Sequence, residues 1–193
     1  MDAEELLQRY APGERNFPGV RLRGVFLDNA NLREINLTKA DLSGANLSGA
    51  NLSGSDLSGA NLSGANLSGV IFIGANLSKA KLRGANFKDS GIIDCNLTEA
   101  ILDGAIFGGE ESTIQGSNFN KASLRGATFI MASLCITTMR SAILDGVVID
   151  TDTGLKDVDL TDASCKGSNL VELNCAWGGT IILPNGQSIS RQD

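Results

Sequence analysis

The sequence predicts an all-β solenoid, a fold in which short repeats stack into coils along one axis. Large apolar residues recur at 18 consecutive positions five apart, from Leu22 to Phe107. A fixed period sustained over this length is the signature of a solenoid. The unit itself, written as ANLSG, ADLSG or SDLSG through residues 40–69, is too short to bury its apolar side alone. Stacked coils solve this problem, because each coil covers the next.

The alternation of side chains along a strand assigns each position of the unit a direction. Leu47 and Ala45 share the inward side, because strand side chains alternate with period two. Asn46 and Ser48 then point outward, and Gly49 lies at the bend, where the absence of Cβ permits unusual backbone angles. A continuous interior of Leu and Ala is therefore expected.

These units resemble the pentapeptide-repeat family, whose pattern is Ala-Asn/Asp-Leu-X-X, over about residues 16–175. The resemblance implies a right-handed quadrilateral β-helix with 20 residues per coil. A left-handed β-helix of hexapeptides is the nearest alternative, and the five-residue period excludes it. With 20-residue coils, the expected interior column includes Leu47, Leu67, Phe87 and Phe107, and an outward amide ladder includes Asn46, Asn66 and Asn86.

The chain divides into three expected segments: an N-terminal cap at 1–15, the β-helix at 16–177, and a C-terminal cap and tail at 178–193. Residues 3–10 have helical spacing of apolar residues, with Asp2 as the N-cap. The segment LLQRYAPGERNF at 6–17 resembles the N-terminal cap of cyanobacterial members of the family. Residues 180–189 predict a hairpin-like cap, two short strands around a Pro-Asn-Gly turn. Trp177 is expected to cover the last coil.

The period is interrupted twice, at 108–116 and at 150–154. Phe107 and Phe119 are 12 residues apart instead of ten, so the segment 108–116 is expected to bulge from the wall. Each interruption is either a binding loop or a tolerated insertion. In the first, Glu110, Glu111 and Gln115 are candidate interaction residues.

Charge is distributed unevenly along the chain. The net charge is −6, and residues 141–193 carry eight acidic and three basic residues. The acids that form a candidate interaction patch there are Asp145, Asp150, Asp152, Asp157, Asp159 and Asp162. Binding of nucleic acid would need a basic stripe, and the sequence is interpreted as having none, so direct binding of nucleic acid is not expected.

No catalytic, cofactor or metal residues are expected. The chain has no His, which removes the most common general base and metal ligand. The segment 150–154 fails the EF-hand pattern, because its fifth position is Gly154. The four cysteines lack CxxC spacing and are interpreted as small buried thiols. We therefore expect a protein that is not an enzyme.

The expected function is a non-catalytic, rigid protein-interaction scaffold of unknown partner. Because some members of the family imitate DNA, the alternative is a DNA mimic that binds DNA gyrase or another DNA-binding protein. Residues 41–78 contain only Asp41 and Asp56 as charges, which argues against mimicry there. No stretch of 18 apolar residues predicts a membrane span, and the N-terminal residues lack a secretory pattern, so a cytoplasmic location is expected.

Overall fold

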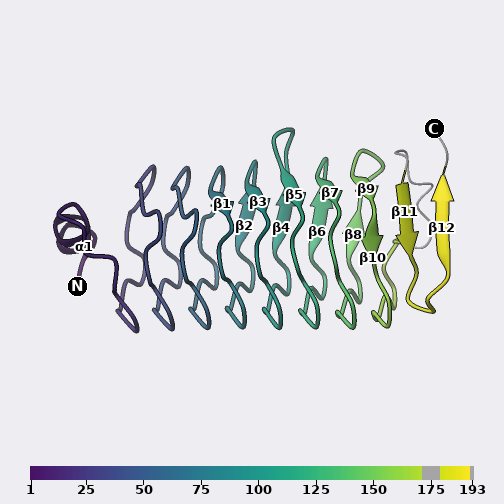
Figure 1. Ribbon diagram of the computed structural model, residues 1–193, viewed down its shortest axis with the longest axis horizontal. Helices are drawn as coiled ribbons and strands as arrows, with labels where there is room; N and C mark the ends of the chain where they lie inside the picture. Colours follow the sequence, from purple (N-terminus) through teal and green to yellow (C-terminus); the bar gives the residue numbers. More distant parts are fainter. Residues whose placement is uncertain (171–178, 192–193) are drawn as a thin grey trace.

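A computed structural model describes residues 1–170 and 179–191 of the chain. Its coils lie side by side along one axis, with a helix at the N-terminal end and a two-stranded hairpin at the other (Figure 1). The coils pair through parallel bridges whose partners are 20 residues apart, beginning with Asn16 and Asn36, except where an insertion widens the spacing to 22, as at Asn96 and Asn118, or to 21, as at Thr138 and Asp159. The 20-residue coil expected from the family resemblance is confirmed.

Each coil has four corners and therefore four sides. In the second coil the corners are marked by residues with positive φ at 39, 44, 49 and 54. We name the sides by the inward residues of this coil: Leu37 on side 1, Leu42 on side 2, Leu47 on side 3 and Leu52 on side 4. The predicted four-sided β-helix is thus confirmed, and the position of a residue within the 20-residue period decides which side it occupies.

Regular strands form on sides 3 and 4 after residue 70. Side 4 carries a parallel sheet of β1 (Ile71–Ile73), β3 (Gly91–Ile93), β5 (Thr113–Gln115), β7 (Ser133–Cys135) and β9 (Gly154–Lys156). Side 3 carries a parallel sheet of β2 (Asn86–Lys88), β4 (Ile106–Gly108), β6 (Thr128–Ile130) and β8 (Val148–Ile149). Side 1 ends in a sheet of β10 (Val158–Asp159), β11 (Gly179–Ile182) and β12 (Ser188–Arg191).

The interior is a set of apolar columns, as the alternation of side chains predicts. Leu37, Leu57 and Leu77 are fully buried on side 1. On side 3 the column changes from leucine to phenylalanine, and the ring centroids of Phe87 and Phe107 are 4.9 Å apart with an interplanar angle of 9°. The stacking continues to Phe129, 4.7 Å from Phe107. Stacked coils therefore align like side chains and keep the core close-packed.

The Asn of the repeat has two functions in the wall. Its Oδ1 accepts a hydrogen bond from the backbone N–H two residues later, as in Asn51 with Ser53 at 3.0 Å. Its Nδ2 donates to the neighbouring coil, as Asn66 does to Asn46 at 3.1 Å. The first bond fixes the corner of one unit and the second joins two coils, so the predicted amide ladder is confirmed.

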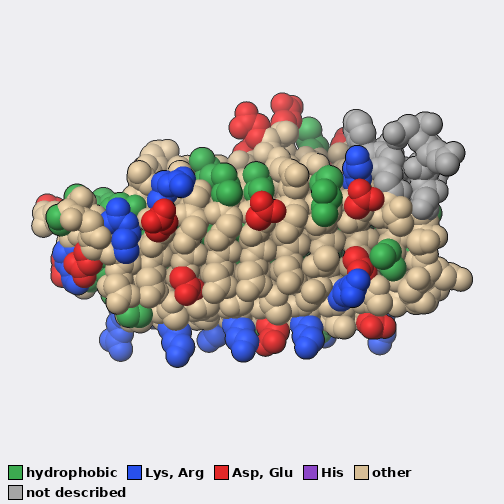
Figure 2. All heavy atoms as spheres, in the orientation of Figure 1, with side chains coloured by type: hydrophobic (Ala, Val, Ile, Leu, Met, Phe, Trp, Pro, Cys, Tyr) green, Lys and Arg blue, Asp and Glu red, His purple; other side chains and the backbone are tan. Residues whose placement is uncertain are grey.

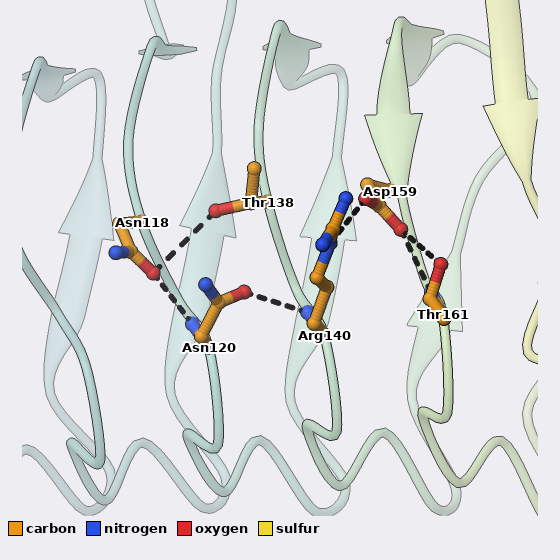
Figure 3. Close-up of polar contacts among 6 residues, drawn as sticks. All are labelled: Asn118, Asn120, Thr138, Arg140, Asp159 and Thr161. Atoms are coloured by element: carbon orange, nitrogen blue, oxygen red, sulfur yellow. Dashed lines mark hydrogen bonds and ion pairs between the residues drawn. The ribbon is translucent and has the colours of Figure 1, made fainter.

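Near the C-terminal end of side 1 the ladder changes into an ionic network (Figure 3). Asn120 accepts a hydrogen bond from the backbone N–H of Arg140 at 2.8 Å, and the Arg140 Nε donates to Asp159 at 2.5 Å. Asp159 also accepts from the backbone N–H and the hydroxyl of Thr161, at 2.9 and 2.6 Å. The same polar positions therefore keep joining coil to coil after the Asn residues end.

The first interruption is shorter than the sequence indicated. Gly108 belongs to β4, paired with Lys88 and Ile130, and residues 113–115 form β5. Only Gly109–Ser112 leaves the wall, so the expectation that all of 108–116 bulges is wrong. The second interruption is a turn between β8 and β9, and Gly154, which the sequence interpretation included in it, belongs to β9.

Both ends of the solenoid carry the predicted kinds of cap. Helix α1 (Ala3–Tyr10) begins at Asp2, whose carboxylate accepts from the backbone N–H of Glu5 at 2.8 Å, and its Leu6 is fully buried. At the other end β11 pairs in parallel with β10 and antiparallel with β12. The expected role of Trp177 concerns a position outside the described residues.

We predict that Gly108→Ala destabilises the fold more than Gly84→Ala does. Both glycines have positive φ, so each substitution carries a backbone cost of about 1–3 kcal/mol. A Cβ at position 108 would also lie 2.2 Å from the carbonyl oxygen of Ile130, whereas a Cβ at position 84 meets nothing within 4 Å. Thermal denaturation followed by circular dichroism measures both variants. Equal losses would show that β4 and β6 are not packed as described.

Candidate functional site

From Ile71 onward, several outward positions on sides 3 and 4 hold exposed aliphatic residues. On side 4 the outward residues Asn51 and Ser53 are followed one coil later by Ile71 and Ile73, which are 40% and 46% exposed. On side 3, three outward aliphatic side chains are also exposed: Ile106, Ile130 and Val148. Packing within the wall does not require these residues, because the second coil uses Asn and Ser at the same positions.

Two corner residues next to β7 depart further from the repeat. Met131 precedes β7 and Ile136 follows it, and both have positive φ, 57° and 51°. Elsewhere the corners mostly hold Gly, Asn, Asp, Glu or Lys. A β-branched residue is disfavoured in this conformation. Both side chains are nevertheless exposed to solvent, Ile136 by 56%. The fold therefore tolerates backbone strain that presents two apolar groups on either side of one strand.

Two loops project from the edge between sides 3 and 4, and Figure 1 shows them on either side of the turn from β6 to β7. In the loop Gly109–Ser112, the Ser112 hydroxyl donates to the carbonyl oxygen of Gly108 at 2.6 Å. In the loop Asp150–Thr153, the Asp150 carboxylate accepts from the Thr153 hydroxyl at 2.6 Å and from the backbone N–H of Met131 at 3.0 Å. Side-chain hydrogen bonds thus hold both loops to the wall.

A groove of about 330 Å³ lies on side 4 between these two loops; we call it the two-loop groove. Its floor follows the outward positions of β5, β7 and β9, which are Thr113, Ser133 and Gly154. These small side chains leave the space that Ile71 fills at the start of the same sheet. The further lining residues are Glu110, Ser112, Met131, Ala132, Leu134, Cys135, Asp152 and Lys156.

The three candidate residues of the first interruption lie near one another on this part of the molecule. Glu110 lines the two-loop groove, and Glu111 is exposed beside it in the same loop. Gln115 is exposed on β5, in register with Cys135 of β7. Asp152, from the second interruption, lines the same groove.

The six C-terminal acids do not form one patch. Asp145 lies on side 2, Asp159 on side 1, and the remaining four occupy corners or the second loop. Several are used within the fold: Asp145 accepts from the Ser164 hydroxyl at 2.6 Å, and Asp157 accepts from the backbone N–H of Thr180 at 3.0 Å. Proximity in sequence therefore does not bring these carboxylates to one surface.

Hydrogen bonding lowers the pKa of Asp159 and of Asp150, two of these six acids. Burial alone would raise the pKa of Asp159, but hydrogen bonds from Thr161 and Arg140 outweigh it and hold the pKa below its ordinary value. At Asp150, burial likewise opposes hydrogen bonds from Thr153 and Met131, and the net pKa is lowered. Both groups are therefore carboxylates that stabilise the native coils at neutral pH.

The cysteines in the part of the chain that the structure describes differ in how accessible their thiols are. Burial raises the pKa of Cys95 to about 11, so this thiol stays protonated, in agreement with its interpretation as a buried small residue. Cys135 and Cys165 are half-buried, more accessible than expected, and Cys175 lies outside the described residues.

Among residues 1–170 and 179–191, no group of three or more His, Cys, Asp or Glu could hold a metal ion. The same residues contain no helix long and apolar enough to span a bilayer.

The exposed apolar residues were missed by the sequence interpretation, although a signal for them exists. Ile73, Met131 and Ile136 interrupt the Asn, Ser and Gly of the repeat at positions that a 20-residue alignment of the coils identifies as outward or corner positions. The fold and the groove together define a rigid β-helical repeat protein with one irregular, partly apolar edge.

The family model for pentapeptide repeats matches residues 16–54 and 50–89, with eight copies. The chain belongs to the pentapeptide-repeat family. A solved structure of HetL, a pentapeptide-repeat protein involved in heterocyst differentiation regulation from the cyanobacterium Nostoc sp. strain PCC 7120, is 25% identical with a TM-score of 0.53. That similarity covers 97% of this chain and 99% of HetL.

A second solved structure, QnrB1, a plasmid-mediated fluoroquinolone resistance protein, is 22% identical over 79% of this chain and 87% of that one, with a TM-score of 0.51. At this identity the likeness shows the shared β-helix only. A search of curated proteins found no match.

We predict that Ile136→Gly stabilises the fold. Glycine adopts the positive φ of this corner without a Cβ penalty, so the free energy of unfolding should rise by about 1 kcal/mol. Ile136→Val, which stays β-branched, is the control and should give no gain. Chemical denaturation measures both variants. A loss of stability in Ile136→Gly would mean that the exposed side chain contributes to folding.

We predict that the stability difference between the wild-type protein and Asp159→Asn depends on pH. Because the folded-state pKa of Asp159 lies below its unfolded value of about 3.9, its stabilisation is present above that pH and is lost as the pH falls through the folded pKa. The wild-type protein should therefore melt above the variant at neutral pH and approach it under acid conditions. Asp162→Asn at an exposed corner is the control. A difference that stays constant from neutral to acid pH would contradict this role of Asp159.

Proposed function

We propose that the protein is a non-catalytic, rigid interaction scaffold that binds a protein partner at the two-loop groove. The observation that carries the proposal is the pair of exposed apolar side chains, Met131 and Ile136, held in a disfavoured backbone conformation beside β7. Strained residues persist where the surrounding structure maintains them, and they often mark binding sites. Here the strain places apolar surface next to a groove of about 330 Å³.

The chemistry of the groove indicates what such a partner would present. Its floor is small and partly apolar, and Ile73 and Ile93 extend this apolar surface along side 4 towards the N-terminus. Glu110 and Asp152 add acidic groups from the two loops, against the single base Lys156. A peptide segment that combines apolar side chains with a lysine or arginine would complement both properties.

The wall supports this function because it can hold the groove in one shape. The floor strands β5, β7 and β9 are paired in parallel, and the side chains beneath them, such as Ile114 and Leu134, are buried. A preorganised site of this kind loses little conformational entropy when a partner binds.

DNA mimicry, the alternative function, receives less support from the positions of the acids. A mimic of the duplex would present carboxylates in a continuous array, because DNA carries one charge per ~1.7 Å of its axis. Asp145, Asp159 and Asp162 occupy different sides or corners, and the first two are paired with Arg125 and Arg140. Binding at the two-loop groove is therefore the function we put forward.

A phage-displayed peptide library selected on the immobilised protein tests this proposal. We expect enriched peptides that contain apolar residues and at least one Lys or Arg. Met131→Ser combined with Ile136→Gly should weaken their binding by about tenfold or more, since both apolar contacts are lost. Phe26→Ser is the matched control, because it removes an exposed side chain on side 3 in the first coil, far from the groove.

Acidic enriched peptides, or peptides insensitive to the groove variant, would contradict the proposal. A supercoiling assay with purified DNA gyrase separates the alternative function. The scaffold predicts that gyrase activity is unchanged, whereas salt-sensitive inhibition would support DNA mimicry.

A further inference from the structure

Sorting the charged residues by side reveals an arrangement that their order in the chain conceals. The outward positions of side 2, together with the corner between sides 1 and 2, form three columns that run the length of the solenoid; we call this surface the basic side. It contains nine basic residues: Arg21, Arg23, Lys39, Lys79, Lys81, Arg83, Lys121, Arg125 and Lys166. It contains five acidic residues: Asp41, Glu99, Asp103, Asp145 and Asp162.

The basic side thus has an excess of four positive charges in a chain whose net charge is −6. Figure 2 shows Lys and Arg side chains gathered along the lower edge, while acidic side chains project from the opposite, upper edge. The sequence-based statement that the chain has no basic stripe is therefore wrong. Bases that are far apart in the chain come together because their spacing matches the 20-residue coil.

On the basic side the acids lie deeper than the bases. The side chain of Asp103 is 24% exposed and that of its ion-pair partner Arg83 is 60% exposed. For Asp145 and Arg125 the values are 23% and 54%. Asp103 also accepts hydrogen bonds from Ser123 and from the backbone N–H of Arg125, so its carboxylate is held close to the wall. The outermost layer of this surface is consequently the most basic.

The corner column is straight and regular. Lys39, Lys79 and Lys121 are exposed and occupy every second coil, with Gly59 and Glu99 between them. Neighbouring coils are about 4.8 Å apart, so these lysines repeat at roughly 10 Å and together span about 19 Å of the edge. A straight row of this kind can contact a planar surface along its whole length.

The shape of the basic side favours one class of anionic partner. A flat wall meets a planar surface over its area but a cylindrical duplex only along a line. Single-stranded nucleic acid is normally held by aromatic side chains on which bases stack. In the described coils the outward columns of the basic side contain no Phe, Tyr or Trp.

We propose that the basic side binds the surface of a membrane that contains anionic lipids. Contact would be peripheral and electrostatic, with lysine and arginine heads at the level of the lipid headgroups. Because the two-loop groove lies on side 4, which is opposite side 2 in the four-sided coil, it would face away from the membrane. This inference does not depend on the proposed peptide binding.

Vesicle co-sedimentation tests the proposal with phosphatidylcholine vesicles that contain or lack phosphatidylserine. We expect the full chain to bind only the anionic vesicles and to dissociate as sodium chloride is raised. The variant K79E/K81E/R83E reverses three bases of one coil and should reduce binding by at least about tenfold. Circular dichroism confirms that each variant used is folded.

The matched control is R33E/K88E/K156E, which makes the same change of net charge on sides 3 and 4 and should alter binding by less than about twofold. An equal loss in both variants, or no preference for anionic vesicles, would overturn the proposal. A parallel titration with a short DNA duplex gives the remaining outcome. Tighter binding to the duplex than to the anionic vesicles, lost in K79E/K81E/R83E, would assign the basic side to nucleic acid and refute membrane binding.

Discussion

The whole structure depends on hydrogen bonding between coils in a register of 20 residues, widened only where the two insertions lie. Each coil donates backbone N–H groups to carbonyl oxygens of the next, as Leu47 does to Asn66 and Leu67 does to Asn86. Within a coil, the five-residue unit points its apolar side chains inward. Only stacking on the next coil pairs its backbone N–H and C=O groups and covers its apolar edges. The register therefore converts a position in the sequence into a side of the molecule. Every surface property of the protein follows from that conversion.

This register explains how one chain can present chemically different surfaces on a uniform core. Residues such as Lys79 and Lys121 are distant in sequence but share an edge, whereas Asp157, Asp159 and Asp162 are close in sequence but point to different sides or corners. The interior does not constrain the outward positions, so they are free to vary by side. The groove with its apolar edge and the basic side consequently lie on opposite parts of the same rigid body, and substitutions in one should leave the other unchanged.

Much of the fold could be predicted from the sequence, because the position of a residue within the five-residue unit predicts whether its side chain points inward or outward. The inward Leu47, the amide ladder at Asn66 and the N-cap at Asp2 were all predicted from local patterns. The extent of the first loop was not, because the sequence does not reveal that Gly108 and Thr113 remain paired to their neighbours. The surfaces were missed for a related reason: charge was counted along the chain, whereas the relevant distances run across coils.

The most direct measurement of the register is a disulfide cross-link to the native Cys135. The account places position 115 beside Cys135 in the parallel sheet, one 20-residue coil further along the chain. In a chain whose Cys95, Cys165 and Cys175 are replaced by serine, Gln115→Cys should form an intramolecular disulfide under mild oxidation. Thr113→Cys should not, because its strand partner is Ser133 and its Cα lies beyond the range that a disulfide spans. Cross-linking through position 113, or none through position 115, would contradict the register.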